Sequence, residues 1–123
     1  MQGIMEVGVD IIEIDRFDEH LLKDTRFLSR LFTKAELSYC MEKANPAPHL
    51  AARFAGKEAA VKALHAAGVK ALISDIEITR TEEGIPGVHL LMDNPPDLEI
   101  RISLSHSNSH AIAFAIIEEQ KKE

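Results

Sequence analysis

The sequence predicts a single α+β domain in which one long helix packs against a mainly antiparallel sheet. Residues 15–67 have the composition and apolar spacing of helices, whereas the residues after Gly68 form short Ile/Val/Leu-rich segments separated by turn residues. Helices followed by strands are typical of α+β proteins rather than of βαβ units. A length of 123 residues leaves room for one domain, 1–123, with one modest core.

The N-terminal part is expected to contain one strand and two helices. Residues 6–14, EVGVDIIEI, have the Val/Ile content of a buried strand, and apolar residues recur at helical spacing over 15–22. Thr33 followed three residues later by Glu36 matches a capping box, in which each residue satisfies a backbone N–H of the other. A helix should therefore run from this point to about Lys43.

The longest helix and the strands follow a Pro-containing break at 45–48. Residues 49–67 are rich in Ala, Leu, Lys and Glu, which are strong helix formers, and this helix should end near Gly68. The remaining segments, with their turns at 84–87 and 94–96, predict strands at 74–79, 88–92, 99–104 and 111–117.

Composition and charge exclude several classes of protein. The net charge of −6 disfavours nonspecific binding to nucleic acid. The sequence has no basic segment leading into an apolar signal region and no run of about 18 apolar residues, so we expect a soluble, cytoplasmic protein without membrane association. Cys40 is the only cysteine, which excludes a disulfide framework within one chain and fits a reducing compartment.

A locally basic strip interrupts the acidic composition. Between Arg16 and Lys34, five basic residues stand against three acidic ones. Such a strip on an acidic protein indicates either an acidic partner or a solvated helix face.

Three further segments carry groups suited to chemistry. Asp10 stands inside an apolar strand, where a carboxylate needs a partner such as a divalent cation, a basic side chain or a helix N-terminus. Glu58 and Lys62 are neighbours on the long helix, either as an ordinary surface ion pair or as a Mg²⁺ ligand beside a phosphate-neutralising lysine. Residues 103–113, SLSHSNSHAIA, form either a simple polar turn or an anion-binding turn between two strands. Adjacent Ser105 and His106 do not form a hydrolase triad.

Together these segments resemble the short bacterial holo-acyl-carrier-protein synthases, a class of 4′-phosphopantetheinyl transferases. The resemblance rests on GVDIIEIDR at 8–16 and above all on RFAGKEAAVKA at 53–63. DIEI at 75–78, Gly84 with Pro86, and Ser105-His106 ahead of two alanines complete it in the family's order, over nearly the whole chain.

The resemblance implies the 4′-phosphopantetheinyl transferase fold and a Mg²⁺-dependent reaction that moves phosphopantetheine from coenzyme A to a carrier-protein serine, releasing 3′,5′-ADP. The expected pathway is fatty-acid biosynthesis, and a carrier protein of polyketide synthesis is the open alternative. It implies that Asp10 and Glu58 hold Mg²⁺, and that Glu58 or water acts as base. Lys62 would neutralise or protonate the leaving phosphate, and Arg53 and His106 would hold the phosphates of coenzyme A.

The resemblance also implies partners and an assembly. An acyl carrier protein, which is acidic, would bind the basic strip, and family members are homotrimers with sites between adjacent subunits. The implied carrier-protein-binding residues are Arg16, Lys23, Arg26 and Phe27.

Two alternatives stay open at this level. A Mg²⁺-dependent hydrolase of the coenzyme A pyrophosphate would need the same carboxylates without a carrier-binding surface. The second alternative is a degenerate subunit that only binds carrier protein. It stays open because residues 65–70, HAAGVK, carry a single glycine where family members have a Gly-x-Gly loop near the nucleotide.

Overall fold

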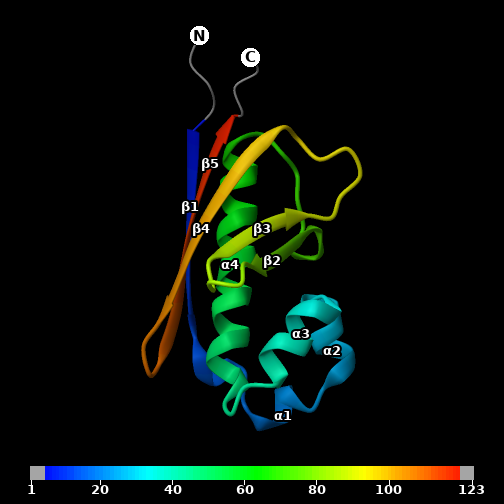
Figure 1. Ribbon diagram of the computed structural model, residues 1–123, viewed down its shortest axis with the longest axis vertical. Coiled ribbons are helices and arrows are strands. Elements are labelled where there is room, and N and C mark those ends of the chain that lie inside the picture. The colour runs from blue at the N-terminus through cyan, green and yellow to red at the C-terminus, as the bar shows by residue number, and fades with distance from the viewer. Residues whose placement is uncertain (1–4, 120–123) are drawn as a thin grey trace.

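The protein has the predicted α+β architecture, seen here in a computed structural model that describes residues 5–119. One long helix runs alongside a sheet, and three short helices gather near the end where that helix begins (Figure 1). In chain order the elements are β1 (Met5–Glu13), the 3₁₀ helix η1 (Ile14–Arg16), α1 (Glu19–Leu22), α2 (Thr25–Leu31), α3 (Lys34–Met41), α4 (Pro46–Ala66), the 3₁₀ helix η2 (Ile73–Asp75), β2 (Ile76–Arg80), β3 (Pro86–Leu90), β4 (Leu98–His106) and β5 (His110–Glu119).

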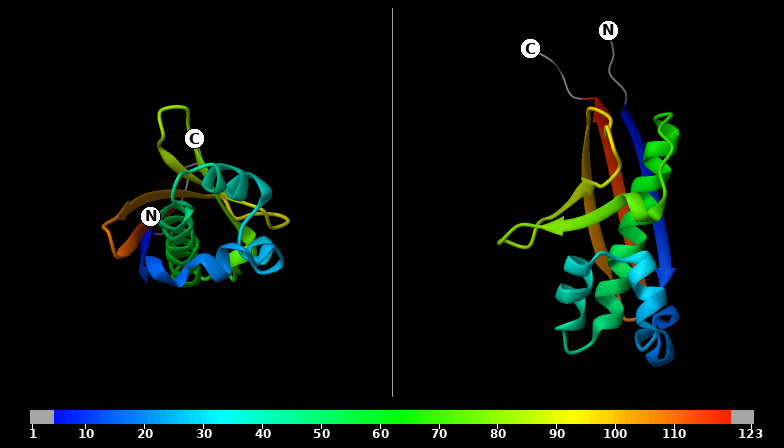
Figure 2. Two further views of the ribbon diagram at one scale, coloured as in Figure 1. Left: turned by 90° about the horizontal axis from the view of Figure 1, so that it is seen from below. Right: turned by 90° about the vertical axis from the view of Figure 1, so that its right-hand side faces the viewer.

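All strand pairs are antiparallel and form two separate sheets. The larger sheet has the order β1-β5-β4, so the last strand lies between the first and the fourth, and β2 pairs only with β3. In this register Asp10 of β1 lies opposite Ala113 of β5, which lies opposite Leu104 of β4. The β2–β3 hairpin projects to the side of the larger sheet (Figure 2).

The core lies between α4 and the inner face of the larger sheet. Small side chains line the contact, because alternate residues of β5 and most of the sheet-facing residues of α4 are alanines with almost no exposed surface. The closest approach is at Gly8 of β1, where a Cβ atom would lie 2.1 Å from the carbonyl oxygen of Ala59. Strand and helix therefore touch backbone to backbone, which also places Asp10, two residues further on the same strand face, beside α4.

Over β1 and β5, the outer face of the same sheet is apolar and uncovered in the single chain. The exposed fraction is 64% at Met5, 62% at Ile11 and 43% at Phe114. The large apolar side chains exposed on this face come from adjacent strands and are Met5, Val7, Val9, Ile11, Ile112 and Phe114.

The structure corrects the predicted helices at two places. The helix expected over 15–22 is divided into η1 and α1, and α2 was not predicted. Two aspartates explain the division, because Asp18 accepts a hydrogen bond from the backbone N–H of Leu21 and Asp24 from that of Phe27. Each aspartate is thus an N-cap that begins a new short helix.

The long helix begins earlier than expected, at Pro46 rather than at 49. Proline fits the first turn of a helix, where the backbone N–H has no intrahelical partner, so the segment 45–48 starts the helix instead of separating it from the preceding one.

The expected turn at 84–87 is also shorter, since β3 already begins at Pro86. The other predicted strands are found, with ends that differ by a few residues. Within residues 5–119 no helix has the length and apolar character needed to cross a membrane.

Candidate active site

Asp10 and Lys62 form an ion pair between β1 and α4. The Nζ atom of Lys62 lies 3.1 Å from Oδ1 of Asp10 and also donates to the backbone oxygen of Val9, at 3.1 Å. The Asp10 side chain is 16% exposed and that of Lys62 is 55% exposed. The surface ion pair between Lys62 and Glu58, one of the two interpretations of the sequence, is not formed. Lys62 turns towards β1 instead.

Glu58 lies one helical turn before Lys62 and has no partner within residues 5–119. Its side chain is half-buried, and it forms no hydrogen bond or ion pair with any residue that the structure describes. A half-buried carboxylate without a partner keeps its oxygen atoms available for a cation. Two carboxylates, Asp10 and Glu58, thus flank one lysine on the same side of α4.

This donor set suits Mg²⁺ bound together with a phosphate substrate. Residues 5–119 contain no group of three or more His, Cys, Asp or Glu side chains able to hold a metal ion. Mg²⁺ does not need such a cage, since it usually keeps several waters and is bound by one or two carboxylates plus substrate phosphates. Asp10 and Glu58 fit that requirement, provided that Lys62 gives up part of its contact with Asp10.

A basic cleft lies on the other side of α4 and contains Arg53 and His106. It has a volume of about 180 Å³ and is also lined by Tyr39, His49 and Arg80. The rings of His49 and His106 meet edge to face, with centroids 6.2 Å apart. The pKa of His49 is lowered, first by burial and then by the positive charge of Arg53 and other cations nearby, so the cleft disfavours a further proton.

The two groups of predicted residues are separated by the helix itself. At about 100° per residue, Arg53 and Glu58 point about 140° apart around the axis of α4. Asp10, Glu58 and Lys62 therefore form one group, and Arg53 and His106 form another that faces α3 and the β2–β3 hairpin. The sequence motifs predicted the members of both groups, whereas Tyr39, His49 and Arg80 of the cleft were not predicted as site residues.

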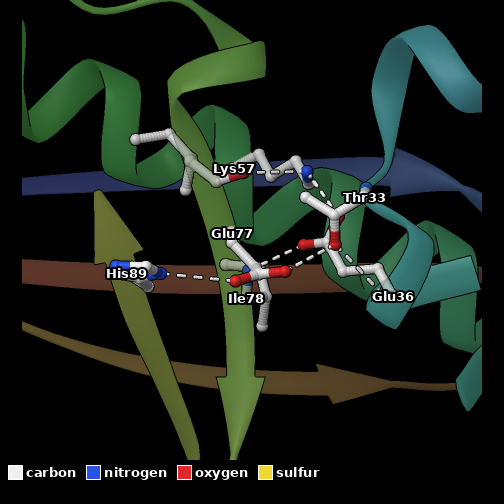
Figure 3. A network of polar contacts seen from close by, with 7 residues as sticks. Thr33, Glu36, Lys57, Glu77, Ile78 and His89 are labelled. Carbon is white, nitrogen blue, oxygen red and sulfur yellow. Dashed lines mark hydrogen bonds and ion pairs between the residues drawn. The ribbon is translucent and has the colours of Figure 1, made fainter. Parts of the chain in front are cut away.

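Lys57 was part of the most specific sequence motif and is a buried structural residue. Its side chain is 1% exposed, and its Nζ atom lies 2.6 Å from Oε1 of Glu36 and donates to the backbone oxygen of Ile76, at 2.9 Å. Glu36 forms the predicted capping box with Thr33 and also accepts from the backbone N–H of Ile78, at 2.6 Å. One buried ion pair thus joins α3, α4 and β2 (Figure 3).

A second carboxylate extends this network to β3. The Thr33 hydroxyl donates to Oε2 of Glu77 at 2.7 Å, and Nδ1 of His89 lies 3.4 Å from Oε1 of the same residue (Figure 3). The hydrogen bond from Thr33 is the main cause that lowers the pKa of Glu77. The elements that carry Tyr39, Arg53 and Arg80 are therefore fixed to one another by polar contacts behind the basic cleft.

The predicted carrier-binding residues come from consecutive short elements. Arg16 ends η1, Lys23 follows α1, and Arg26 and Phe27 lie in the first turn of α2. All are exposed, including 38% of Phe27, and the three basic side chains form no ion pair with a described residue. Their charges are thus free to act on a partner.

Comparison with known proteins identifies relatives over nearly the whole chain. A model of the 4′-phosphopantetheinyl transferase superfamily matches residues 6–115. Holo-acyl-carrier-protein synthase of Moorella thermoacetica is 42% identical over 122 residues, covering 94% of each chain. The protein of the same name from Protochlamydia amoebophila is 45% identical over 116 residues, covering 89% of this chain and 94% of its own.

A solved structure gives the same fold. The complex of a synthase of this kind with coenzyme A, described as from Chronobacterium ammoniagenes, superimposes with a TM-score of 0.79 at 26% identity, covering 96% of this chain and 99% of that one.

Proposed function

The chain belongs to the 4′-phosphopantetheinyl transferase superfamily, and from this membership we propose that it transfers the 4′-phosphopantetheine arm of coenzyme A to a serine of an apo acyl carrier protein, releasing 3′,5′-ADP. The curated relatives are named for this activity, and the structural relative holds coenzyme A. The observation that carries the proposal is the half-buried, unpartnered carboxylate of Glu58 beside the Asp10–Lys62 ion pair. The protein is thus an enzyme, a holo-acyl-carrier-protein synthase.

Asp10 and Glu58 are the residues that would hold Mg²⁺. When bound, the ion supplies Lewis-acid polarisation of the β-phosphate of coenzyme A. Lys62, mostly exposed and anchored to the Val9 carbonyl, places its positive charge where negative charge develops on the leaving 3′,5′-ADP. Either Glu58 itself or a water molecule beside it would accept the proton of the attacking serine.

We also propose that the active site is shared between subunits of a homotrimer. Asp10, Glu58 and Lys62 of one subunit would act with Arg53 and His106 of its neighbour. Their position on opposite sides of α4 supports this arrangement, because one copy of the helix separates the two groups. The apolar outer face of β1 and β5 supplies a surface that association would bury.

A complementation experiment tests the shared site. Glu58→Ala and Arg53→Gln variants should each be inactive alone and regain transfer activity after they are unfolded together and refolded as mixed oligomers. Restoration is expected because some sites then combine an intact Glu58 from one subunit with an intact Arg53 from the other. Mixed oligomers with no activity would place both residues in the site of a single subunit.

The carrier protein would dock on Arg16, Lys23, Arg26 and Phe27. An Arg16→Glu substitution should raise the KM for carrier protein and leave the binding of coenzyme A unchanged, because it reverses one exposed charge away from the nucleotide site. Steady-state kinetics at low salt check this. An unchanged KM for the carrier would remove Arg16 from the docking surface.

Intact-mass spectrometry tests the reaction itself. Apo acyl carrier protein incubated with the enzyme, coenzyme A and Mg²⁺ should gain one phosphopantetheine, and the gain should disappear with EDTA. Cleaved coenzyme A with an unmodified carrier would indicate a hydrolase. Carrier binding without any change in coenzyme A would indicate a non-catalytic subunit.

A further inference from the structure

The ring of Tyr39 is surrounded by cations. The Nζ atom of Lys43 lies 4.3 Å from the ring centroid, and the guanidinium carbons of Arg53 and Arg80 lie 4.5 and 4.3 Å from it. These cations come from the segment just after α3, from α4 and from β2, so residues distant in the sequence converge on one aromatic side chain. Cations over an aromatic face are attracted by its quadrupole, which offsets part of their mutual repulsion.

No carboxylate of the described part of the chain forms an ion pair with this cluster of Lys43, Arg53 and Arg80. The carboxylates lining the adjacent cavity, Glu36 and Glu77, are engaged by the buried network instead. The cluster therefore keeps its positive charge.

The guanidinium group of Arg53 has hydrogen-bond donors without a described acceptor. Its side chain belongs to a residue only 8% exposed, yet its five N–H donors have a single described acceptor, the backbone oxygen of His49 at 3.2 Å. No buried side-chain nitrogen of the described residues lacks a partner, so the other nitrogens of Arg53 are not sealed from solvent, and Arg53 lines both the basic cleft and the adjacent cavity. A nearly buried guanidinium with free donors is suited to an anion that enters this cleft.

We infer that Arg80 is a further substrate-binding residue, which receives a phosphate group of coenzyme A together with Arg53, and that Tyr39 is the positioning residue for both guanidinium groups. The inference rests on the proposed function, because it names a further contact to the same substrate. Arginine suits this role since its planar N–H donors match phosphate oxygens in pairs.

The β2–β3 hairpin is built to keep Arg80 in the cleft. Arg80 ends β2, and Gly84 in the following turn has a φ of +86° that favours glycine. A Cβ atom at Gly84 would lie 3.3 Å from Nη2 of Arg80, so the missing side chain leaves room for the guanidinium. The Thr33–Glu77 hydrogen bond holds the same strand against α3, which carries Tyr39.

Calorimetric titration with coenzyme A and with 3′-dephospho-coenzyme A tests the role of Arg80. Arg80→Gln should weaken binding of coenzyme A about tenfold or more, as expected for a lost hydrogen bond to a charged group. Arg30→Gln, which removes the same charge from an exposed position on α2 outside the cleft, is the matched control and should bind like the wild type.

The two ligands distinguish the phosphates. A tenfold loss for coenzyme A alone assigns Arg80 to the 3′-phosphate, and an equal loss for both ligands assigns it to the pyrophosphate. Wild-type affinity of Arg80→Gln for both ligands would overturn the inference while leaving the proposed function intact. A wild-type protein that fails to bind coenzyme A would overturn both.

Substitutions of Tyr39 test its positioning role. Tyr39→Phe retains the aromatic face and should bind coenzyme A like the wild type, whereas Tyr39→Leu should lose as much affinity as Arg80→Gln. Thermal unfolding of both variants identifies any general loss of folding. The positioning role is overturned if folded Tyr39→Leu binds normally, or if Tyr39→Phe binds as weakly as Tyr39→Leu, since the hydroxyl would then be the required group.

Discussion

Lys57 and Lys62 lie on the same helix, and each forms an ion pair with a carboxylate from another element, but their surroundings differ. Lys57 is 1% exposed, and its partner Glu36 receives hydrogen bonds from two backbone N–H groups as well. Lys62 is 55% exposed, and the side chain of its partner Asp10 has no other described hydrogen bond or ion pair. Beside Lys62, moreover, Glu58 has no partner at all among the described residues.

This comparison separates a structural ion pair from one suited to a ligand. Removing charge from water is costly, and the buried pair is stable because Lys57 also donates to Ile76 and Glu36 also accepts from two backbone N–H groups. A group that is fully satisfied within the protein has nothing left to offer a substrate. The incomplete contacts around Lys62 are therefore the better indication of chemistry, although both lysines belong to one sequence motif.

The largest expected effect is on transfer activity, and it comes from the two carboxylates beside Lys62. Asp10→Ala and Glu58→Ala should each lower the rate of phosphopantetheine transfer by about a hundredfold or more, because charge stabilisation at the reacting phosphate is lost. Neither should change the midpoint of thermal unfolding appreciably. Glu42→Ala, an exposed carboxylate after α3, is the matched control. Near-normal turnover of either variant would remove that residue from the site.

The second prediction concerns stability, for which the buried lysine should matter more than the exposed one. Lys57→Met should lower the free energy of unfolding by about 3–5 kcal/mol, because it leaves the Glu36 carboxylate buried without its counter-charge. Lys62→Met should lower it by less than about 1 kcal/mol, as is usual for an exposed pair. Urea unfolding measures both. Equal losses would mean that burial does not distinguish the two pairs.

The third prediction concerns the coupling within the buried pair. The double variant Glu36→Leu with Lys57→Met should be more stable than the sum of the two single losses implies, by about 1–3 kcal/mol, because no charge is then left unpaired. It should stay less stable than the wild type, since the backbone N–H groups of Thr33 and Ile78 lose their acceptor. Strictly additive losses, measured by the same urea unfolding, would refute the coupling.

The smallest effect on stability is expected for Glu77, at the edge of the polar network around Glu36 and Lys57. The pKa of Glu77 is lowered from 4.5 by the Thr33 hydrogen bond, so the ionised form stabilises the folded state above pH 4.5, and this stabilisation is lost as the pH falls through the lower folded-state value. The difference in unfolding free energy between wild type and Glu77→Gln should therefore shrink below pH 4.5. A difference that is constant with pH would exclude this contribution.

The sequence predicted the fold well where local signals agree with it. The capping box at Thr33 and Glu36 is found, and the Ala-rich composition of α4 is that of a helix pressed closely against a sheet. The prediction was wrong where local signals have two meanings. Aspartate can stand within a helix or begin one, and only the packed structure shows that Asp18 and Asp24 begin separate helices.

The candidate site was predicted only in part, for a similar reason. The motif around Arg53 and Glu58 contains several charged residues but does not show which side of the helix other elements cover. Lys57 could therefore not be recognised as buried. Arg80 lies outside the motifs, and its approach to Tyr39 depends on how the β2–β3 hairpin packs beside α3. Such contacts between distant segments leave no local pattern in the sequence.

The absence of a side chain at Gly8 has a consequence for the tolerance of this protein to mutation. Any larger residue there would collide with the backbone of α4 and push the helix away from β1, which carries Asp10. In a library randomised at position 8 and selected for phosphopantetheine transfer, glycine should be recovered almost exclusively. A residue without any functional group would thus be as intolerant of replacement as the carboxylates that it brings within reach of α4.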